Sequence, residues 1–249
     1  MAKLRKTTHT PCAVCPLGAK DIFRKLTAAE FKFVQQFKSG EILAEPGSTF
    51  LIEGHNSPSL YTVLEGWAFR YKSLEDDRRQ ILSFALPGDF LGIQSAVFSE
   101  LQYTVEALTP LRLCTFSRSK LWDLYSGHPA LCHDLMSLSA RAEQMADVHL
   151  LTVGRRTAAE RIGYLLLHLF NRCKALDIAR GSSFDLPITQ THIADALGLS
   201  LVHTNKTLRS LMNLKLINWE VGAVEIYDEA GLRALSKYDE DDSAKRPFI

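Results

Sequence analysis

The stretch from residue 188 to residue 209 constrains this chain of 249 residues more than any other part of it. It reads as a short helix, a three-residue turn and a second helix. Thr189 is placed to cap the first helix, and Gly198 supplies the left-handed backbone conformation that ends it. Ser200 then stands where the second helix begins and can cap it in turn. The pattern favours a helix-turn-helix unit.

The second helix of this unit has two unlike faces. Thr204, Leu208 and Leu211 recur at the spacing of a single buried face. The opposite face is polar and basic, a character that suits the major groove of DNA. Its residues are Val202, His203, Asn205, Lys206 and Arg209. The alternative is an ordinary helical hairpin inside an α-helical domain.

Two short β-like runs follow directly. Leu216–Val221 and Ala223–Tyr227 are separated by Gly222, a residue suited to a tight hinge. A helix-turn-helix followed by such a hairpin is typical of the winged helix-turn-helix. The hairpin therefore strengthens the prediction of DNA binding.

The formal net charge of +1 means that the molecule as a whole is no polycation. Any affinity for DNA must therefore come from a local basic surface rather than from bulk charge. The helix-turn-helix holds few cations, so Arg155, Arg156 and Arg161, just upstream, are candidates to add to that surface.

Length and apolar content suggest a protein of two domains without membrane contact. No apolar run approaches the roughly 20 residues that a membrane-spanning helix needs, and the basic N-terminus lacks the apolar core of a secretory signal. We therefore expect a cytoplasmic protein. The reducing environment there disfavours structural disulfides among the five cysteines.

Short β-like runs punctuated by glycine dominate residues 26–125. Such runs with frequent turns are typical of an antiparallel barrel or jelly roll. The predicted strands are Gly40–Leu43, Thr49–Ile52, Leu60–Leu64, Ala68–Tyr71 and Arg79–Ala85. The expected fold class is α+β, with this barrel at the N-terminal end.

After Pro129 the pattern changes to that of a long helix. Apolar residues recur there at alternating steps of four and three, the heptad spacing of a helix that pairs with another. The predicted dimer seam is Leu131, Leu135, Leu138, Ala142, Met145 and His149. A second apolar set consists of Met136, Ala140, Leu150 and Val153. One stripe can face the chain's own barrel and the other a partner; the alternative is one amphipathic helix packed on its own domain.

These patterns divide the chain into consecutive parts. They are an N-terminal arm with a Cys-x-x-Cys pair (1–25), a sensory β-barrel (26–125), a dimerisation helix (126–154), a winged helix-turn-helix domain (155–236) and a charged tail (237–249). The composition of the tail is typical of a disordered segment.

The order of these parts resembles the CRP/FNR superfamily of bacterial transcription regulators. Besides the helix-turn-helix, the residues that carry the resemblance are Gly40-Glu41, Leu64-Glu65-Gly66 and Leu86-Pro87-Gly88-Asp89-Phe90-Leu91-Gly92. The resemblance covers nearly the whole chain. It implies a barrel like that of cyclic-nucleotide-binding domains, a homodimer joined through the long helix, and partnership with RNA polymerase.

Cyclic AMP is not the expected effector. Relatives that bind it place a glutamate for the ribose after the glycine-rich turn, and an arginine–serine pair for the phosphate further on. Ile93 or Gln94 matches the glutamate position here, and the segment Glu100–Thr104 contains no arginine. A buried phosphate without a cation is poorly stabilised.

The cysteines indicate a different signal. The resemblance implies that Cys12, Cys15 and Cys114 match three of the four cysteines that hold a [4Fe–4S] cluster in the oxygen-sensing FNR branch. The remaining arm position holds Asp21, a harder and weaker ligand for a cluster than a thiolate. Three interpretations stay open: a cluster with an aspartate ligand, a zinc site that adds His9, or an arm that binds no metal.

The resemblance also assigns roles in DNA recognition. The residues concerned are Gln190, Thr191, Ser200, Leu201, Val202, His203, Asn205, Lys206 and Arg209. Lys206 matches an arginine that reads guanine in relatives, whereas Val202 replaces a glutamate that accepts a hydrogen bond from cytosine. Because valine accepts nothing, we expect a half-site unlike the common one. A twofold dimer would read a palindrome with half-sites roughly 34–36 Å apart.

Other classes compete with a regulator that senses a redox or gas signal. One is the same DNA-binding scaffold without an effector, controlled by its abundance. Another is a barrel-based interaction module whose helical part binds protein. An enzyme is not expected, because the sequence has no glycine-rich phosphate loop, nucleophile elbow or two-histidine metalloprotease helix.

Overall fold

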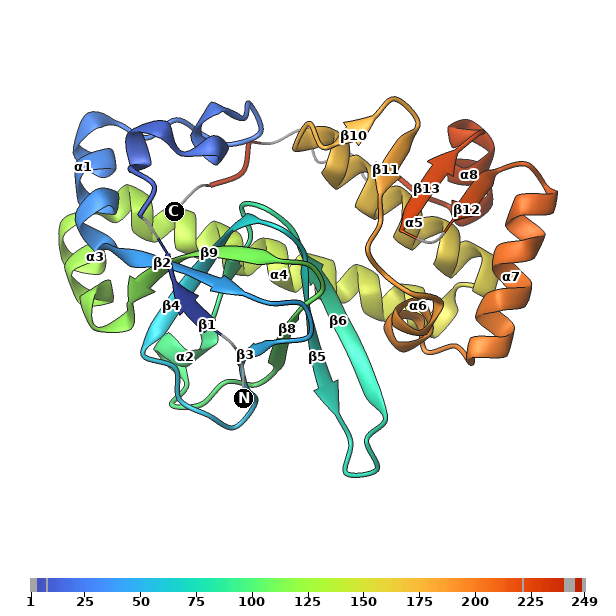
Figure 1. The fold of residues 1–249 in the computed structure, drawn as a ribbon, viewed down its shortest axis with the longest axis horizontal. Coiled ribbons are helices and arrows are strands. Elements are labelled where there is room, and N and C mark those ends of the chain that lie inside the picture. Colours follow the sequence, from blue (N-terminus) through green and yellow to red (C-terminus); the bar gives the residue numbers. More distant parts are fainter. Residues whose placement is uncertain (1–3, 8, 221, 240–244, 248–249) are drawn as a thin grey trace. The chain divides into compact units, whose positions relative to one another are not determined.

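The computed structural model describes residues 4–7, 9–220, 222–239 and 245–247 (Figure 1). The chain forms two compact units. The first comprises Met1–Asp76, Leu82–Glu143 and Lys245–Ile249, and the second comprises Asp77–Ile81 and Gln144–Ala244. The last residues of the chain therefore group with its N-terminal half.

The first unit is a β-roll made of two antiparallel sheets. One sheet has, in spatial order, β1 (Leu4–Lys6), β2 (Lys38–Ala44), β9 (Leu111–Ser117), β4 (Ser59–Glu65) and β7 (Phe90–Leu91). The other has β3 (Thr49–Leu51), β8 (Thr104–Ala107), β5 (Ala68–Ser73) and β6 (Arg79–Ala85). Each strand predicted from the sequence lies in one of these, so the barrel prediction is confirmed.

Apolar side chains from both sheets form one core. Val63 on β4, Leu113 on β9 and Val105 on β8 are fully buried in it. Gly66, which follows β4, has a φ of +88°, and a Cβ there would lie 2.3 Å from the carbonyl oxygen of Pro110. Only glycine fits such a conformation and approach, which explains the glycine of the Leu64-Glu65-Gly66 motif.

The β-rich region also contains a helix that the sequence pattern did not reveal. It is α1 (Ala28–Phe37), which Thr27 begins with a capping box. The Thr27 hydroxyl accepts from the Glu30 amide at 3.3 Å, and the Glu30 carboxylate accepts from the Thr27 amide at 2.7 Å. The Thr-x-x-Glu spacing was a readable signal for this helix. Further helices of the first unit are α2 (Gln94–Val97) and α3 (Leu121–Gly127).

The long helix α4 (Pro129–Arg155) contradicts the predicted dimer seam at two of its residues. Leu131 and Leu135 are 0% and 3% exposed, so they pack inside the chain and cannot meet a partner. The second apolar set is the accessible one, since Met136 and Leu150 are 67% and 69% exposed. The prediction is wrong for Leu131 and Leu135, because spacing alone does not tell which stripe the chain itself covers. The other seam residues, Leu138, Ala142, Met145 and His149, are half-buried, and their place in a dimer stays a prediction.

The second unit is a small helical domain with a sheet. Its helices are α5 (Ala158–Ala175), α6 (Gln190–Leu197), α7 (Leu201–Asn213) and α8 (Glu229–Ser236). Its sheet has the order β10 (Ala179–Arg180), β11 (Ser183–Asp185), β13 (Ala223–Ile226) and β12 (Ile217–Glu220). The strands β12 and β13 confirm the predicted wing; Val221, assigned to its first strand, lies outside the described residues.

The end of the chain differs from the expected disordered tail. Arg246 forms a parallel β-bridge with Phe23, and its guanidinium lies 2.6 Å from the Asp89 carboxylate. Pro247 is buried. The expectation of disorder is therefore wrong for these residues, since a charged composition does not reveal a docking site elsewhere in the chain.

Among the described residues, no helix is long and apolar enough to cross a membrane.

Candidate DNA-binding interface

Side-chain caps fix the two helices of the helix-turn-helix. The Thr189 hydroxyl accepts from the His192 amide at 3.2 Å, and the His192 ring accepts from the Thr189 amide at 3.0 Å. Gly198 ends α6 with a φ of +62°. The Ser200 hydroxyl accepts from the His203 amide at 3.2 Å and begins α7. The three predicted boundary residues are confirmed, while the capping role of His192 was missed.

The inner faces of α6 and α7 are apolar and closely packed. Ile193 and Leu197 on α6 and Leu208 on α7 are at most 1% exposed. Ala194 is buried, and its carbonyl accepts from the Leu199 amide at 3.1 Å as the chain turns. The buried face predicted for the second helix is thus confirmed, and the position of α7 is set by packing.

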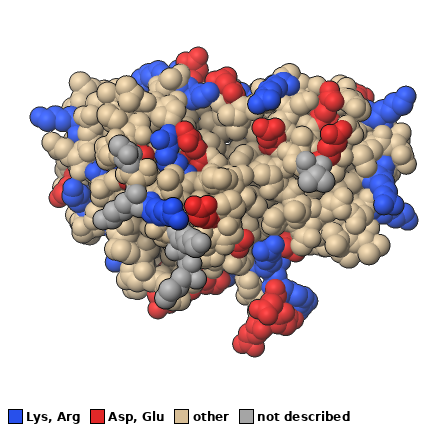
Figure 2. All heavy atoms as spheres, viewed as in Figure 1, with Lys and Arg blue, Asp and Glu red and all other residues tan. Residues whose placement is uncertain are grey.

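The outer face of α7 is open to solvent. Val202 is 79% exposed and Leu201 46% exposed. His203, Lys206 and Arg209 are also exposed, while Asn205 is half-buried. In Figure 2, Lys and Arg side chains predominate along the edge where α7 lies. At the start of α6, Thr191 is exposed and Gln190 half-buried. The structure thus places the residues assigned to DNA contact on α7, with its cap Ser200, and at the start of α6.

Two of the arginines suggested as extra DNA contacts have structural roles. Arg161 donates to the Arg156 carbonyl at 2.8 Å and to the Leu197 carbonyl, at the end of α6, at 2.9 Å. The Arg156 guanidinium lies 4.2 Å from the centre of the Tyr164 ring and donates to the Thr152 hydroxyl at 2.6 Å. These groups hold the helices together, so Arg155, which is exposed, is the remaining candidate.

A buried tyrosine packs against the glycine-rich turn of the β-roll. Tyr103 lies in the segment where the phosphate-binding arginine of nucleotide-binding relatives would be expected, and it is 3% exposed. Its hydroxyl accepts a hydrogen bond from the Gly92 amide at 3.2 Å, so an amide of the glycine-rich turn is already used. The Cζ atom of the Arg70 guanidinium lies over the Tyr103 ring, 4.7 Å from the ring centre. The Tyr103 ring and hydroxyl are therefore both engaged by groups of the chain itself.

The cysteine region contains a buried ion pair that the sequence did not indicate. The Lys38 ammonium donates to the Glu41 carboxylate at 2.6 Å and lies close enough to Cys114 to interact with it electrostatically. Burial disfavours both charges, but the hydrogen bond between them prevails, raising the pKa of Lys38 and lowering that of Glu41. Burial raises the pKa of Cys114 to about 12. Cys114 is therefore a neutral thiol beside a charge-balanced pair.

The structure does not assemble the metal-ligand set predicted from the sequence among the residues that it describes. Cys12 and Cys15 are half-buried beside 3₁₀ turns, and Asp21 is exposed. In the described part of the chain, no three His, Cys, Asp or Glu side chains are arranged to hold a metal ion. The geometry gives no support to the ligand set predicted from the sequence.

Comparisons with known proteins agree with this architecture. Residues 34–128 match the model of the cyclic nucleotide-binding domain, and residues 160–235 match that of the Crp-like helix-turn-helix domain. The nitrogen fixation regulation protein FixK of Bradyrhizobium diazoefficiens is 30% identical over 225 residues, which cover 90% of this chain and 93% of FixK. The transcriptional activator protein FnrL of Cereibacter sphaeroides is 28% identical over 203 residues, 80% of this chain and 81% of FnrL. The structure of FixK2 from Bradyrhizobium japonicum is similar with a TM-score of 0.72 and 26% identity, covering 80% of this chain and 98% of that one.

Proposed function

Because the chain belongs to the CRP/FNR family of transcription regulators, we propose that it binds a palindromic operator as a homodimer and needs no cofactor to do so. The observation that carries this proposal is the outer face of α7, which is exposed, polar and basic on a helix whose inner face is fixed by caps and packing. Such a regulator acts in the cytoplasm on chromosomal DNA and works with RNA polymerase.

Lys206 is the proposed base-reading residue. Its side chain is exposed at the centre of the outer face, where an ammonium group reaches the O6 and N7 acceptors of guanine. Val202 precedes it by one helical turn and offers a methyl-sized apolar contact, which suits the methyl group of thymine. Thr191 and Gln190 are proposed to contact phosphate at the start of α6.

Dimerisation is proposed through the exposed stripe of α4. Met136, Ala140 and Leu150 lie on one side of the helix and are all exposed. Two copies of such a stripe can pack on each other around a twofold axis, as apolar heptad positions do. A substitution that charges this stripe should therefore separate the subunits without unfolding them.

The absence of a fitting ligand set favours control by abundance over control by a bound signal. Tyr103 fills the β-roll beside Gly92, and the Lys38–Glu41 pair lies against Cys114. Both features engage these groups with partners from the chain itself. We therefore place the regulator without an effector ahead of the redox sensor.

The test is operator selection from random duplexes with the full chain, prepared without added metal. We expect a palindromic consensus and a mass of two chains per duplex. The Leu150→Glu variant should be monomeric with an unchanged melting temperature, whereas Leu135→Glu should lose stability. Binding without sequence preference, or none, would favour a protein-interaction module.

A further inference from the structure

The N-terminal arm crosses the β-roll between two groups of charged side chains. It runs from Thr10 to Arg24, after β1 and before α1, and carries Cys12 and Cys15 between these ends. Each end is held by hydrogen bonds to residues distant in the sequence. We call the two groups the Thr10 site and the Arg24 site.

At the Thr10 site the barrel binds the backbone of the arm. The Thr10 amide donates to the Glu41 carboxylate at 2.8 Å, and the Thr10 carbonyl accepts from the Lys38 ammonium at 2.9 Å. The Thr10 hydroxyl donates to Glu41 and accepts from Arg112. The side chains of Lys38 and Glu41 are 3% and 0% exposed. All the polar groups of Thr10 are thus used by a buried ion pair and its neighbour.

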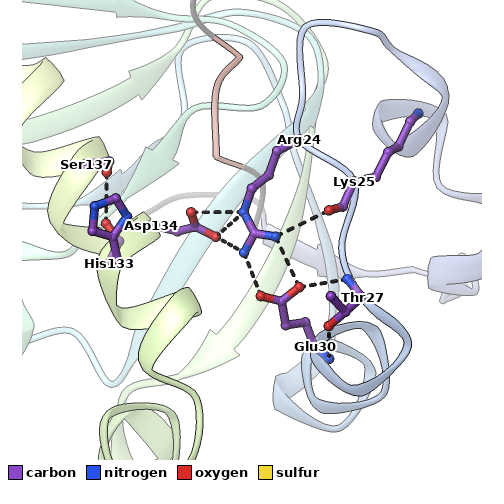
Figure 3. A network of polar contacts seen from close by, with 7 residues as sticks. All are labelled: Arg24, Lys25, Thr27, Glu30, His133, Asp134 and Ser137. Atoms are coloured by element: carbon purple, nitrogen blue, oxygen red, sulfur yellow. Dashed lines mark hydrogen bonds and ion pairs between the residues drawn. The ribbon is translucent and has the colours of Figure 1, made fainter.

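At the Arg24 site the arm supplies the cation (Figure 3). The Arg24 guanidinium donates to Asp134 on α4 at 2.8 Å and to Glu30 on α1 at 2.9 Å. Asp134 and Glu30 are 4% and 7% exposed. The several N–H groups of the Arg24 guanidinium thus donate to two nearly buried carboxylates. Such hydrogen bonds between charged groups are stronger than those between neutral groups.

The C-terminal tail adds backbone hydrogen bonds to the Arg24 site. The Arg24 amide donates to the Arg246 carbonyl at 2.9 Å, and the Arg246 amide donates to the Ile22 carbonyl at 2.7 Å. Phe23, between these residues, is 1% exposed, and its ring leaves no room for a Cβ on Gly88. The end of the arm is therefore fixed on both sides.

We infer that the Thr10 and Arg24 sites, and not the cysteines, fasten the arm to the β-roll, so that the arm stays in place without a metal. The Lys38 ammonium interacts with Cys114, and its charge is already matched by Glu41. Asp21 contributes to neither site. The fastening itself does not depend on the proposed function; only its consequence, operator binding that is indifferent to metal, rests on it.

The experiment measures how fast trypsin cuts after Lys20 in the arm and after Lys25 directly behind it, in the full-length, metal-free protein, with fragments identified by mass spectrometry. Cleavage after Arg24 is not scored, because the Arg24→Gln variant lacks that site. The Lys38→Met/Glu41→Leu variant replaces the ion pair by apolar side chains of similar volume, which cores tolerate, but removes the bonds to Thr10. Arg24→Gln weakens the other site. Each variant should be cut at least ten times faster than the wild type, while retaining its circular dichroism. The control Lys32→Met, at an exposed position of α1, should be cut at the wild-type rate.

A second set of variants tests the alternative, in which the cysteines fasten the arm to the β-roll. Cys12→Ser/Cys15→Ser should be cut within twofold of the wild-type rate, and adding zinc, or ferrous iron with sulfide under anaerobic conditions, should not slow cleavage. Faster cleavage of the serine variant, protection by either metal, or wild-type cleavage of a folded Lys38→Met/Glu41→Leu variant would overturn the inference. Should the latter variant not fold, Arg24→Gln decides alone. Operator binding is measured separately, so its failure would count against the proposed function and not against the fastening of the arm.

Discussion

The helix-turn-helix and the N-terminal arm were both marked by short sequence motifs, but only in the first does the geometry match the expectation. Thr189, Gly198 and Ser200 act within three or four residues of themselves. In the arm, by contrast, Lys38 binds Thr10 across 28 residues and Arg24 binds Asp134 across 110. Local chemistry can be read from spacing, whereas the partner of a buried charge depends on the folded chain.

The largest expected effect is on stability and comes from a substitution at the site that binds the N-terminal arm. Glu41→Leu removes the acceptor of the Thr10 amide and leaves the Lys38 ammonium buried without its partner. An unpaired buried charge costs about 3–5 kcal/mol, so the free energy of unfolding should fall by that amount in urea denaturation. Glu65→Leu is the control, because Glu65 is exposed and binds Arg112 at the surface. Equal stability of the two variants would mean that the Lys38–Glu41 ion pair does not contribute to the free energy of unfolding.

A second prediction concerns the helix-turn-helix. Lys206→Ala should weaken operator binding by about 1–3 kcal/mol and relax the preference at one base position of each half-site. The folded state should be unaffected, since the side chain is exposed. Fluorescence anisotropy with the selected operator and with single-base variants measures both effects. A loss that is uniform across all sequences would place Lys206 at a phosphate instead.

These two regions also show how far the sequence could be read. The barrel strands, the long helix and the winged helix-turn-helix followed from periodicity, glycines and caps. The helix α1 was missed, although its Thr27-x-x-Glu30 box was visible, because the surrounding pattern favoured strands. Leu131 and Leu135 were assigned to a partner because a heptad stripe looks the same whichever surface covers it. Lys38 and Asp134 had no local signal at all.

The ionisation of Glu30 makes the stability of the protein depend on pH. Its pKa is lowered from 4.5 to about 2, first by the hydrogen bond from Arg24 and then by the capping contacts with Thr27. A depressed pKa gives stability that is present above pH 4.5 and is lost as the pH falls toward 2, here by about 1–2 kcal/mol. Urea unfolding between pH 6 and pH 2.5 should show a shallower decline in Glu30→Gln than in the wild type. Parallel curves would mean that Arg24 does not hold Glu30 ionised.

The smallest effect isolates the local signal from which the helix-turn-helix was predicted. Ser200→Ala removes the hydroxyl that accepts from the His203 amide at the start of α7 and should lower the free energy of unfolding by about 1 kcal/mol. Ser210→Ala is matched to it, being an exposed serine on the same helix whose hydroxyl caps nothing there. The alanine at 210 should be neutral or slightly stabilising, because alanine is the better helix former. If both variants had equal stability, α7 would be held by the packing of its buried face alone, and the capping serine would mark where the helix begins without contributing to its stability.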